Sequence, residues 1–285
     1  MRDTRLHELL QAGLAAQAQN NQVQAEEFYD LALQEFPEST NALNLLGSLY
    51  AEQRNYDDAL PLLQKAVTLQ PQQPIFNANL GNLLRQMGET ESALPFLRAA
   101  VNLQPDYPEA ICNLGQAYEE LHKIDEARRC YQRAIRADGT YIRALLLLGA
   151  LETEAGDEEA SLAAFRRVLI LAPGDTRAIS GIMLSSKVTP NLPELAVLEK
   201  LLAGSLQQGR QHRLLFAAGK AYNDLGRYDE AMRHLHLAKE SSGRSFDLVA
   251  FRAYVDALIN LFTTEFLSAR AGQGRSRCIP AVAGR

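Results

Sequence analysis

The sequence predicts an all-α repeat fold in which pairs of helices recur every 34 residues along the 285-residue chain. Two observations carry this prediction. Five columns of similar residues share that period, and the apolar residues within each period follow helical rather than strand spacing. The columns are Gly13, Gly47, Gly81, Gly115 and Gly149; Ala25, Ala59, Ala93, Ala127 and Ser161; Tyr29, Leu63, Leu97, Tyr131 and Phe165; Ala32, Ala66, Ala100, Ala134 and Val168; and Pro37, Pro71, Pro105, Gly139 and Pro173.

Each period has room for two helices and two turns. Leu43, Leu46 and Tyr50 lie on one helical face, and a second apolar stripe runs from Ala59 to Val67. The glycine column and the first alanine column allow the two helices to approach closely, and the large residue of the third column fills the space beside them. Polar turns rich in glycine and acidic residues separate the helices. Proline closes the unit because it cannot continue a helix.

This pattern resembles the tetratricopeptide repeat. The resemblance implies a right-handed α-solenoid whose first helices line a concave groove. Asn77 and Glu152 stand where an aromatic residue is usual in that family, and such departures do not change the expected fold. We interpret residues 1–175 as five regular repeats, with bounds at 6–39, 40–73, 74–107, 108–141 and 142–175.

The pattern weakens in residues 176–211, which we interpret as a degenerate helical repeat. Met183 and Leu195 occupy the columns of small residues, and Pro190 and Pro193 interrupt the pattern. We expect helices over about 176–186 and 194–208, joined by a looser connection.

The pattern returns in residues 212–245, where Gly219 and Ala231 have the spacing of a further repeat. An amphipathic helix is predicted over 246–270, as a cap on the last repeat, and a disordered tail over 271–285. The apolar stripe of the predicted helix consists of Phe246, Val249, Ala250, Tyr254, Leu258, Leu261 and Phe262.

Composition narrows the functional classes. With 29 Lys and Arg against 34 Asp and Glu, the net charge of -5 lacks the basic surplus that a nucleic-acid binder uses to neutralise phosphates. Three scattered cysteines fit a reducing compartment. The sequence shows neither a signal-peptide core nor an apolar run of about 18 residues, so we expect a cytoplasmic protein without a membrane span.

The predicted site is a groove along the first helices. Asn79 and Asn113 lie 34 residues apart, and their amide groups can both donate to and accept from a peptide backbone. The alternative, that these are merely solvated polar positions, stays open. The predicted groove residues are Asn41, Asn44, Ser48, Asn79, Asn82, Asn113, Gln116 and Glu120.

The predicted charge of the groove is negative. Glu52, Glu119, Glu120 and Glu154 lie at inner positions, and Arg85 is the only nearby cation in this interpretation. We therefore expect a neutral to basic protein or peptide partner rather than an acidic tail.

Other candidate sites carry less weight. His234 and His236 are two residues apart on a helix, so they face different directions and do not make a metal pair. Cys112 and Cys130 fit small buried thiols. The residues from Gly272 to Gly274 lack the strand and helix of a nucleotide loop. The sequence therefore predicts no metal, no cofactor and no enzyme activity.

A second resemblance concerns the C-terminal third. Residues 225–240 and 261–274 resemble the end of the repeat region in bacterial proteins that join tetratricopeptide repeats to a sulfotransferase domain. That resemblance implies a truncated or diverged relative without catalytic machinery, because Pro280 interrupts the strand expected next and no phosphate-binding loop follows.

Three functions are consistent with the sequence. The first is a protein-interaction scaffold that binds extended peptide segments in the groove. The alternative is the non-catalytic repeat half of a truncated sulfotransferase, which would recruit protein substrates. The third is a glycosyltransferase-associated repeat protein, because a similar asparagine ladder occurs in O-linked N-acetylglucosamine transferase.

Overall fold

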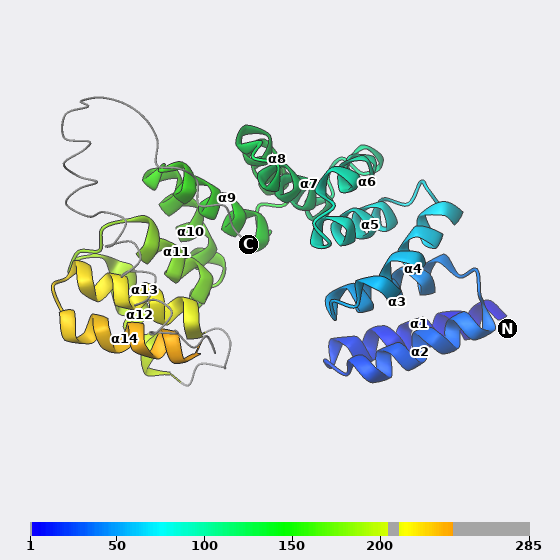
Figure 1. Ribbon diagram of the computed structural model, residues 1–285, viewed down its shortest axis with the longest axis horizontal. Coiled ribbons are helices and arrows are strands. Elements are labelled where there is room, and N and C mark those ends of the chain that lie inside the picture. The colour runs from blue at the N-terminus through cyan, green and yellow to red at the C-terminus, as the bar shows by residue number, and fades with distance from the viewer. Residues whose placement is uncertain (1, 205–210, 242–285) are drawn as a thin grey trace, which may run out of the picture.

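The computed structural model describes residues 2–204 and 211–241. Within these ranges the chain forms 14 helices and no strand. Figure 1 shows the helix pairs following one another along the long axis of the molecule, from α1–α2 in blue to α13–α14 in yellow and orange. The helices are α1 (Arg2–Ala18), α2 (Gln22–Glu35), α3 (Thr40–Glu52), α4 (Tyr56–Leu69), α5 (Pro74–Gln86), α6 (Thr90–Leu103), α7 (Pro108–Glu120), α8 (Ile124–Ala137), α9 (Ile142–Ala155), α10 (Glu158–Leu171), α11 (Thr176–Ser185), α12 (Pro193–Ala203), α13 (Gln211–Asp224) and α14 (Tyr228–Ser241).

The helices pack as a solenoid. Each odd-numbered helix from α1 to α9 packs against the helix that follows it, and each second helix also packs against the first helix of the next pair. The predicted all-α solenoid of helix-turn-helix repeats is thereby confirmed. The cap predicted over 246–270 and the tail predicted over 271–285 lie outside the described residues.

The core follows the predicted columns. The two alanine columns are fully buried in the first four repeats, and the large residue of the third column packs against the glycine of its own repeat. In the fourth repeat, a Cβ atom added to Gly115 would lie 2.6 Å from Cε1 of Tyr131, which is closer than two carbon atoms can approach. Glycine is therefore required where the two helices of a repeat meet.

A residue in the left-handed backbone conformation follows the first helix in six of the described helix pairs, as the turn sequences indicate. Gly88, Gly156 and Gly226 have φ values of 83°, 81° and 72°, a conformation that glycine adopts without a steric cost. In three other turns the same conformation falls on Asn20, Arg54 and His122. The helix-turn-helix geometry is thus kept where the turn lacks glycine.

The structure explains why Glu152 is tolerated at an aromatic position. Its carboxylate is only 4% exposed and accepts two hydrogen bonds from Arg128 of the preceding repeat, Nε to Oε1 at 2.6 Å and Nη2 to Oε2 at 3.0 Å. The same two columns meet between the first and second repeats, where the Tyr50 hydroxyl donates to Glu26 at 3.0 Å. The residue pair changes between repeats, but the contact is kept.

The closing column has a second role that the sequence analysis missed. A cation from the second helix of one repeat donates to the backbone carbonyl that ends the repeat before it, where the helix dipole is negative. The contact is absent from the third repeat, which has Ala99 at the cation's position. The bonds are Lys65 to Pro37 at 2.9 Å, Arg133 to Pro105 at 2.6 Å and Arg167 to Gly139 at 2.9 Å.

The degenerate segment keeps its first helix and displaces its second. Helices α11 and α12 lie where the sequence predicts helices, although α12 begins at Pro193, in whose first turn proline is well accommodated. Phe165, which packs against Gly149 of its own repeat, also packs against Gly181 of α11, two residues before the column position held by Met183. Helix α13 packs directly against α11, whereas α12 packs mainly against α11 alone.

The connection from α11 to α12 is held by α13. The backbone N–H of Val188 donates to Oδ2 of Asp224 at 2.9 Å, and Lys220 donates to the carbonyl of Ser186 and pairs with Asp224. These contacts continue the array across the irregular segment, because they join α13 to the end of α11.

Asp175 caps the N-terminus of α11, and the pKa of its carboxyl group is lower than the ordinary value. Burial alone would raise its pKa, but hydrogen bonds from the Arg177 side chain and from the backbone N–H groups of Ala178 and Arg177 lower it below the ordinary value. A carboxyl group whose pKa falls on folding stabilises the folded state above its ordinary pKa, and loses this effect as the pH falls through the folded value.

We expect Asp175→Ala to lower the free energy of unfolding at pH 7 by about 1 kcal/mol, a typical N-cap effect. The difference from the wild type should shrink as the pH falls below about 4, because the carboxyl group then binds a proton more readily in the unfolded state, and the rest of the effect is lost as the pH falls through the lower folded pKa. Urea unfolding at pH 7 and pH 3 measures both values. Asp175→Asn keeps the acceptor without the charge and should lose less at pH 7. An equal loss at both pH values would contradict the electrostatic origin.

Candidate functional site

The first helices of the repeats form one continuous face. Helix α3 contacts α5, α5 contacts α7, α7 contacts α9 and α9 contacts α11. In the described part of the chain, successive second helices do not pack against one another in this way. The first helices therefore lie on the inside of the curve, and the predicted groove residues are carried by α3, α5 and α7.

Asn79 is the residue around which the N-terminal part of this face is organised. Its Nδ2 donates to Oδ1 of Asn44 at 2.9 Å and to the hydroxyl of Ser48 at 3.0 Å, both on the preceding first helix. Asn79 is half-buried, and no hydrogen bond within the described residues uses its Oδ1. That oxygen is therefore an acceptor available to a ligand, whereas Asn44 is buried beneath it.

Asn113 is placed differently from Asn79, although the two share one column. It is only 1% exposed, and its Oδ1 accepts from Nη2 of Arg143 at 3.0 Å. The same nitrogen donates to Oε1 of Gln116 at 2.6 Å. The prediction that Asn113 faces the groove is thus corrected, because its side chain is buried and its amide oxygen is occupied by the Arg143 guanidinium.

Arg143 also corrects the predicted charge of the groove, in which Arg85 was the only cation. Among the described residues Arg143 pairs with no carboxylate; its partners are the two amides and the Tyr141 hydroxyl. Arg85, in contrast, is paired with Glu120 and donates to Oδ1 of Asn82 at 3.0 Å. Arg143 is therefore the cation of this face whose charge is not offset by a carboxylate.

The carboxylates lie along one edge of the face. Glu52, Glu120 and Glu154 recur at 34-residue intervals, at or near the ends of α3, α7 and α9, and Gln86 occupies the same place on α5. All four are exposed. A hollow of about 420 Å³ lies at this edge, lined by Ala51, Glu52, Arg54, Tyr56 and Gln86.

Glu119 does not belong to that edge. It is half-buried and accepts a hydrogen bond of 2.5 Å from the hydroxyl of Tyr131, inside its own helix pair. Burial raises its pKa, the bond from Tyr131 opposes this effect, and the charges of Glu154 and Glu120 add to the rise. Glu119 therefore supports the core beneath the groove rather than facing a ligand.

The remaining predicted residues lie at the surface to different degrees. Asn41 is exposed at the start of α3, and Ser48, Asn82 and Gln116 are half-buried at equivalent places on α3, α5 and α7. The predicted groove therefore carries amide and hydroxyl side chains on α3, α5 and α7, with Arg143 near the start of α9 and carboxylates at or near the ends of α3, α7 and α9.

Burial accounts for Cys112 and Cys130, and contacts within α13–α14 account for His234. Burial raises the pKa of Cys112 to about 12 and that of Cys130 to about 11, which disfavours the reactive thiolate. Nδ1 of His234 lies 2.8 Å from the carbonyl of Glu230, and its ring lies 5.0 Å from that of Tyr222. In the described ranges no group of three or more potential metal ligands comes together.

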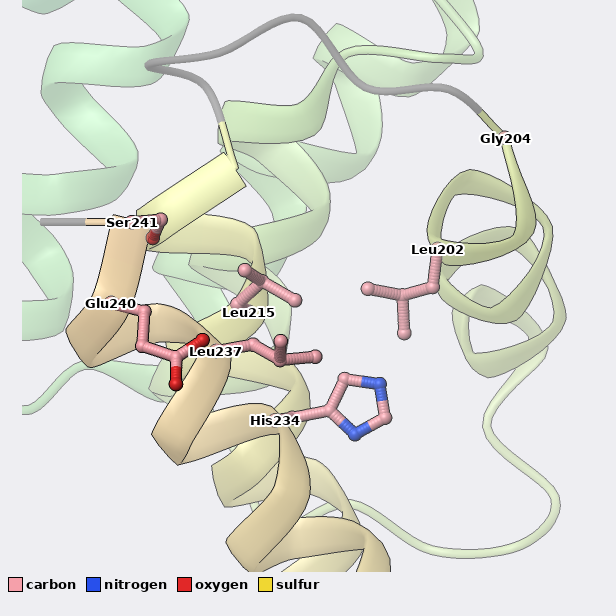
Figure 2. A pocket seen from close by; sticks show the side chains of 7 residues that line it. All are labelled: Leu202, Gly204, Leu215, His234, Leu237, Glu240 and Ser241. Atoms are coloured by element: carbon pink, nitrogen blue, oxygen red, sulfur yellow. The ribbon is translucent and has the colours of Figure 1, made fainter.

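A second hollow lies away from the groove, between α12 on one side and the pair α13–α14 on the other (Figure 2). It measures about 400 Å³, and the side chains of Leu202, Leu215 and His234 point toward it. The sequence analysis missed it because it depends on where α12 lies, which the repeat pattern does not determine. Leu237, Glu240, Ser241 and Gly204 complete the lining.

The fold and its repeat period identify the family. Five tetratricopeptide repeat models match residues 9–39, 40–73, 74–140, 112–176 and 212–242. The chain belongs to the tetratricopeptide repeat family. The matched residues include the pair α13–α14 and omit residues 177–211. These models lend no support to the sulfotransferase resemblance.

Solved structures, two of them of tetratricopeptide repeat proteins, show the same fold. The Thermus thermophilus protein TTC0263 is 22% identical, with a TM-score of 0.57 over 62% of this chain and 99% of its own. A Parabacteroides merdae repeat protein is 20% identical, with a TM-score of 0.60 over 88% and 97%. The pilus biogenesis factor PilW is 16% identical, with a TM-score of 0.57 over 86% and 97%. Comparison with curated proteins gave no match.

No helix in the described ranges of this repeat protein has both the length and the apolar character that crossing a membrane requires.

Proposed function

We propose that this protein is an interaction scaffold that binds an extended peptide segment along the face of α3, α5, α7 and α9. The proposal assigns a binding role and no catalytic step. The observation that carries it is the state of Asn79, whose two donors are used by Asn44 and Ser48 while its oxygen is unused among the described residues. An acceptor fixed in this way suits a peptide N–H group.

The rest of the face complements that acceptor. Arg143 is held by Asn113 and Gln116 and offers its remaining donors to a peptide carbonyl. The fixed acceptor on the third repeat and the fixed donor on the fifth would engage an N–H group and a C=O group at two separated points of one extended chain. Binding through the peptide backbone demands little of the ligand's sequence.

The charges favour a neutral to basic segment. The edge formed by Glu52, Glu120 and Glu154 carries three carboxylates, of which Arg85 neutralises one. Basic side chains of the ligand would lie along this edge, where their attraction to it weakens as salt is added. A cytoplasmic location stays a prediction from the sequence.

We expect Asn79→Ala to weaken peptide binding about tenfold, equivalent to about 1.4 kcal/mol. The test selects ligands from a displayed library of random peptides with the wild-type protein, and then measures Kd by fluorescence polarisation. Asn102→Ala makes the same change at an exposed position on the second helix α6 and should leave Kd unchanged.

Two further measurements complete this test. Circular dichroism checks that Asn79→Ala keeps its helices, because the change leaves the buried oxygen of Asn44 without its partner. The selected peptides should carry no net negative charge. Failure to select any peptide, or equal affinities for the two alanine variants, would contradict the groove.

A further inference from the structure

Three positions of a repeat face the repeat that follows. They are numbered here from the first residue of each repeat, so that residue 40 is position 1 of the second repeat. Position 5 holds Asn44, which accepts a hydrogen bond from Asn79 in the next repeat. Position 17 holds Thr90, whose hydroxyl donates to Glu120 in the next repeat at 2.8 Å. These contacts show which side of a repeat its successor covers.

The third such position is position 21. It holds Arg128, which pairs with Glu152 of the next repeat at 2.6 Å. Its counterpart Leu94, one repeat earlier, packs against the main hydrophobic core. All three positions are thus used by an adjacent first helix within the regular part of the array.

The last described pair carries large apolar residues at the same three positions. Gly219 and Ala231 align α13–α14 with Gly47 and Ala59, so that positions 5, 17 and 21 are Phe216, Tyr228 and Met232. These three side chains are 50%, 65% and 54% exposed. We call them the end face.

An uncovered face of this composition costs free energy, because exposed apolar side chains forgo the stabilisation that burial gives them. In a stacked array the terminal repeat is the one that lacks a neighbour, and solubility requires that its apolar face be covered. The end face is therefore a candidate docking surface.

We propose that residues 246–262 of this chain dock on the end face. Forty-four residues follow Ser241, and the segment begins only a few residues after it. Its apolar side chains recur at helical spacing, from Phe246 and Val249 to Leu261 and Phe262. A short connection favours antiparallel packing of neighbouring helices, which is how each first helix meets the second helix before it in this array.

The docked segment would lie where an eighth first helix belongs. Phe216, on the first helix of the last pair, would then contact it from one side, and Met232, on the second helix, from the other. This inference does not depend on the proposed peptide groove, which lies on α3 to α9.

The experiment measures hydrogen exchange in the full-length protein. If the segment docks, peptides from 246–262 should exchange at least tenfold more slowly than the same sequence as a free peptide. Phe216→Glu and Met232→Glu should each remove most of this protection. Ile170→Glu places the same charge on an exposed apolar position of α10 that does not belong to the end face, and should leave the protection unchanged.

A reciprocal variant keeps the test valid if a change in α13–α14 unfolds that pair. Leu258→Glu alters the segment alone, and should speed exchange in α14 around Met232 without lowering the protection of α1 to α10. Fast exchange of 246–262 in the wild type would overturn the proposal, as would protection that neither end-face variant lowers.

A second copy of the chain could also cover the end face, and light scattering separates the two cases. The proposal expects the monomer mass of 31.5 kDa in the wild type and in all variants. A doubled mass that Phe216→Glu returns to the monomer value would assign the end face to a dimer and overturn docking of the segment.

Discussion

Replacing Arg128 by leucine is expected to lower the free energy of unfolding by about 3 kcal/mol. The change removes both hydrogen-bond donors from the carboxylate of Glu152, which is 4% exposed and packed within α9. A buried carboxylate without a partner either stays charged at a large cost or takes up a proton. Either outcome destabilises the contact between the fourth and fifth repeats.

The double variant Arg128→Leu/Glu152→Tyr should regain most of that loss. It places at this contact the residue types that stand one repeat earlier, at Leu94 and Tyr118. A buried ion pair can often be replaced by well-packed apolar residues at little cost, whereas removal of one partner alone is costly. The double-mutant cycle, measured by urea unfolding, should therefore be strongly non-additive.

Arg129→Leu is the matched control for this cycle. Arg129 is adjacent in sequence but exposed, and its ion pair with Glu126 spans 4.0 Å, so its loss should change the free energy of unfolding by less than about 0.5 kcal/mol. If Arg128→Leu were as mild as this control, the pair with Glu152 would not stabilise the repeat interface.

The helix pairs and the core were predictable because both are properties of a single repeat. Glycine and alanine recur wherever two helices of a pair approach, so the columns at Gly115 and Ala127 follow from the period alone. The left-handed turn residue could also be anticipated at Gly88 and Gly156, since glycine accepts positive φ. These inferences need only local spacing and no knowledge of the neighbouring repeat.

The surface of the groove was less predictable, because it depends on contacts between repeats. Asn44 and Asn113 lie away from the apolar stripe of their own pair, which suggested exposure. The next first helix covers that side, and it brings Asn79 onto Asn44 and Arg143 onto Asn113. A residue 30 or 35 positions later therefore decides whether an asparagine is exposed on this face.

Some inter-repeat contacts did leave a signal in the sequence. The cations Lys65, Arg133 and Arg167 stand on the 34-residue grid, each 28 residues after the carbonyl that it binds. A search for charged as well as apolar columns would have found them. The position of α12 leaves no such signal, since it depends on how α13 packs against α11.

The second large effect is expected at Gly115. Gly115→Val should lower the free energy of unfolding by about 3 kcal/mol, at the upper end of the usual cost of overpacking. The new Cβ would lie 2.6 Å from Cε1 of Tyr131 and 3.1 Å from Cβ of Cys130. The ring of Tyr131 is fully buried, and its hydroxyl is bonded to Glu119, so it can move away only by breaking that bond.

Gly115→Ala separates this clash from the general effect of removing a glycine. Alanine favours a helix over glycine by about 1 kcal/mol, so a net loss of stability would come from the contact with Tyr131. Gly174→Ala is the control, because an added Cβ meets nothing within 4 Å there and should be neutral or slightly stabilising. A Gly115→Ala variant more stable than the wild type by about 1 kcal/mol, the full propensity gain, would show that α7 and α8 can separate without cost. In that case the glycine column would not set the distance between the helices of a repeat, nor the position of Gln116 and Glu120 on the groove.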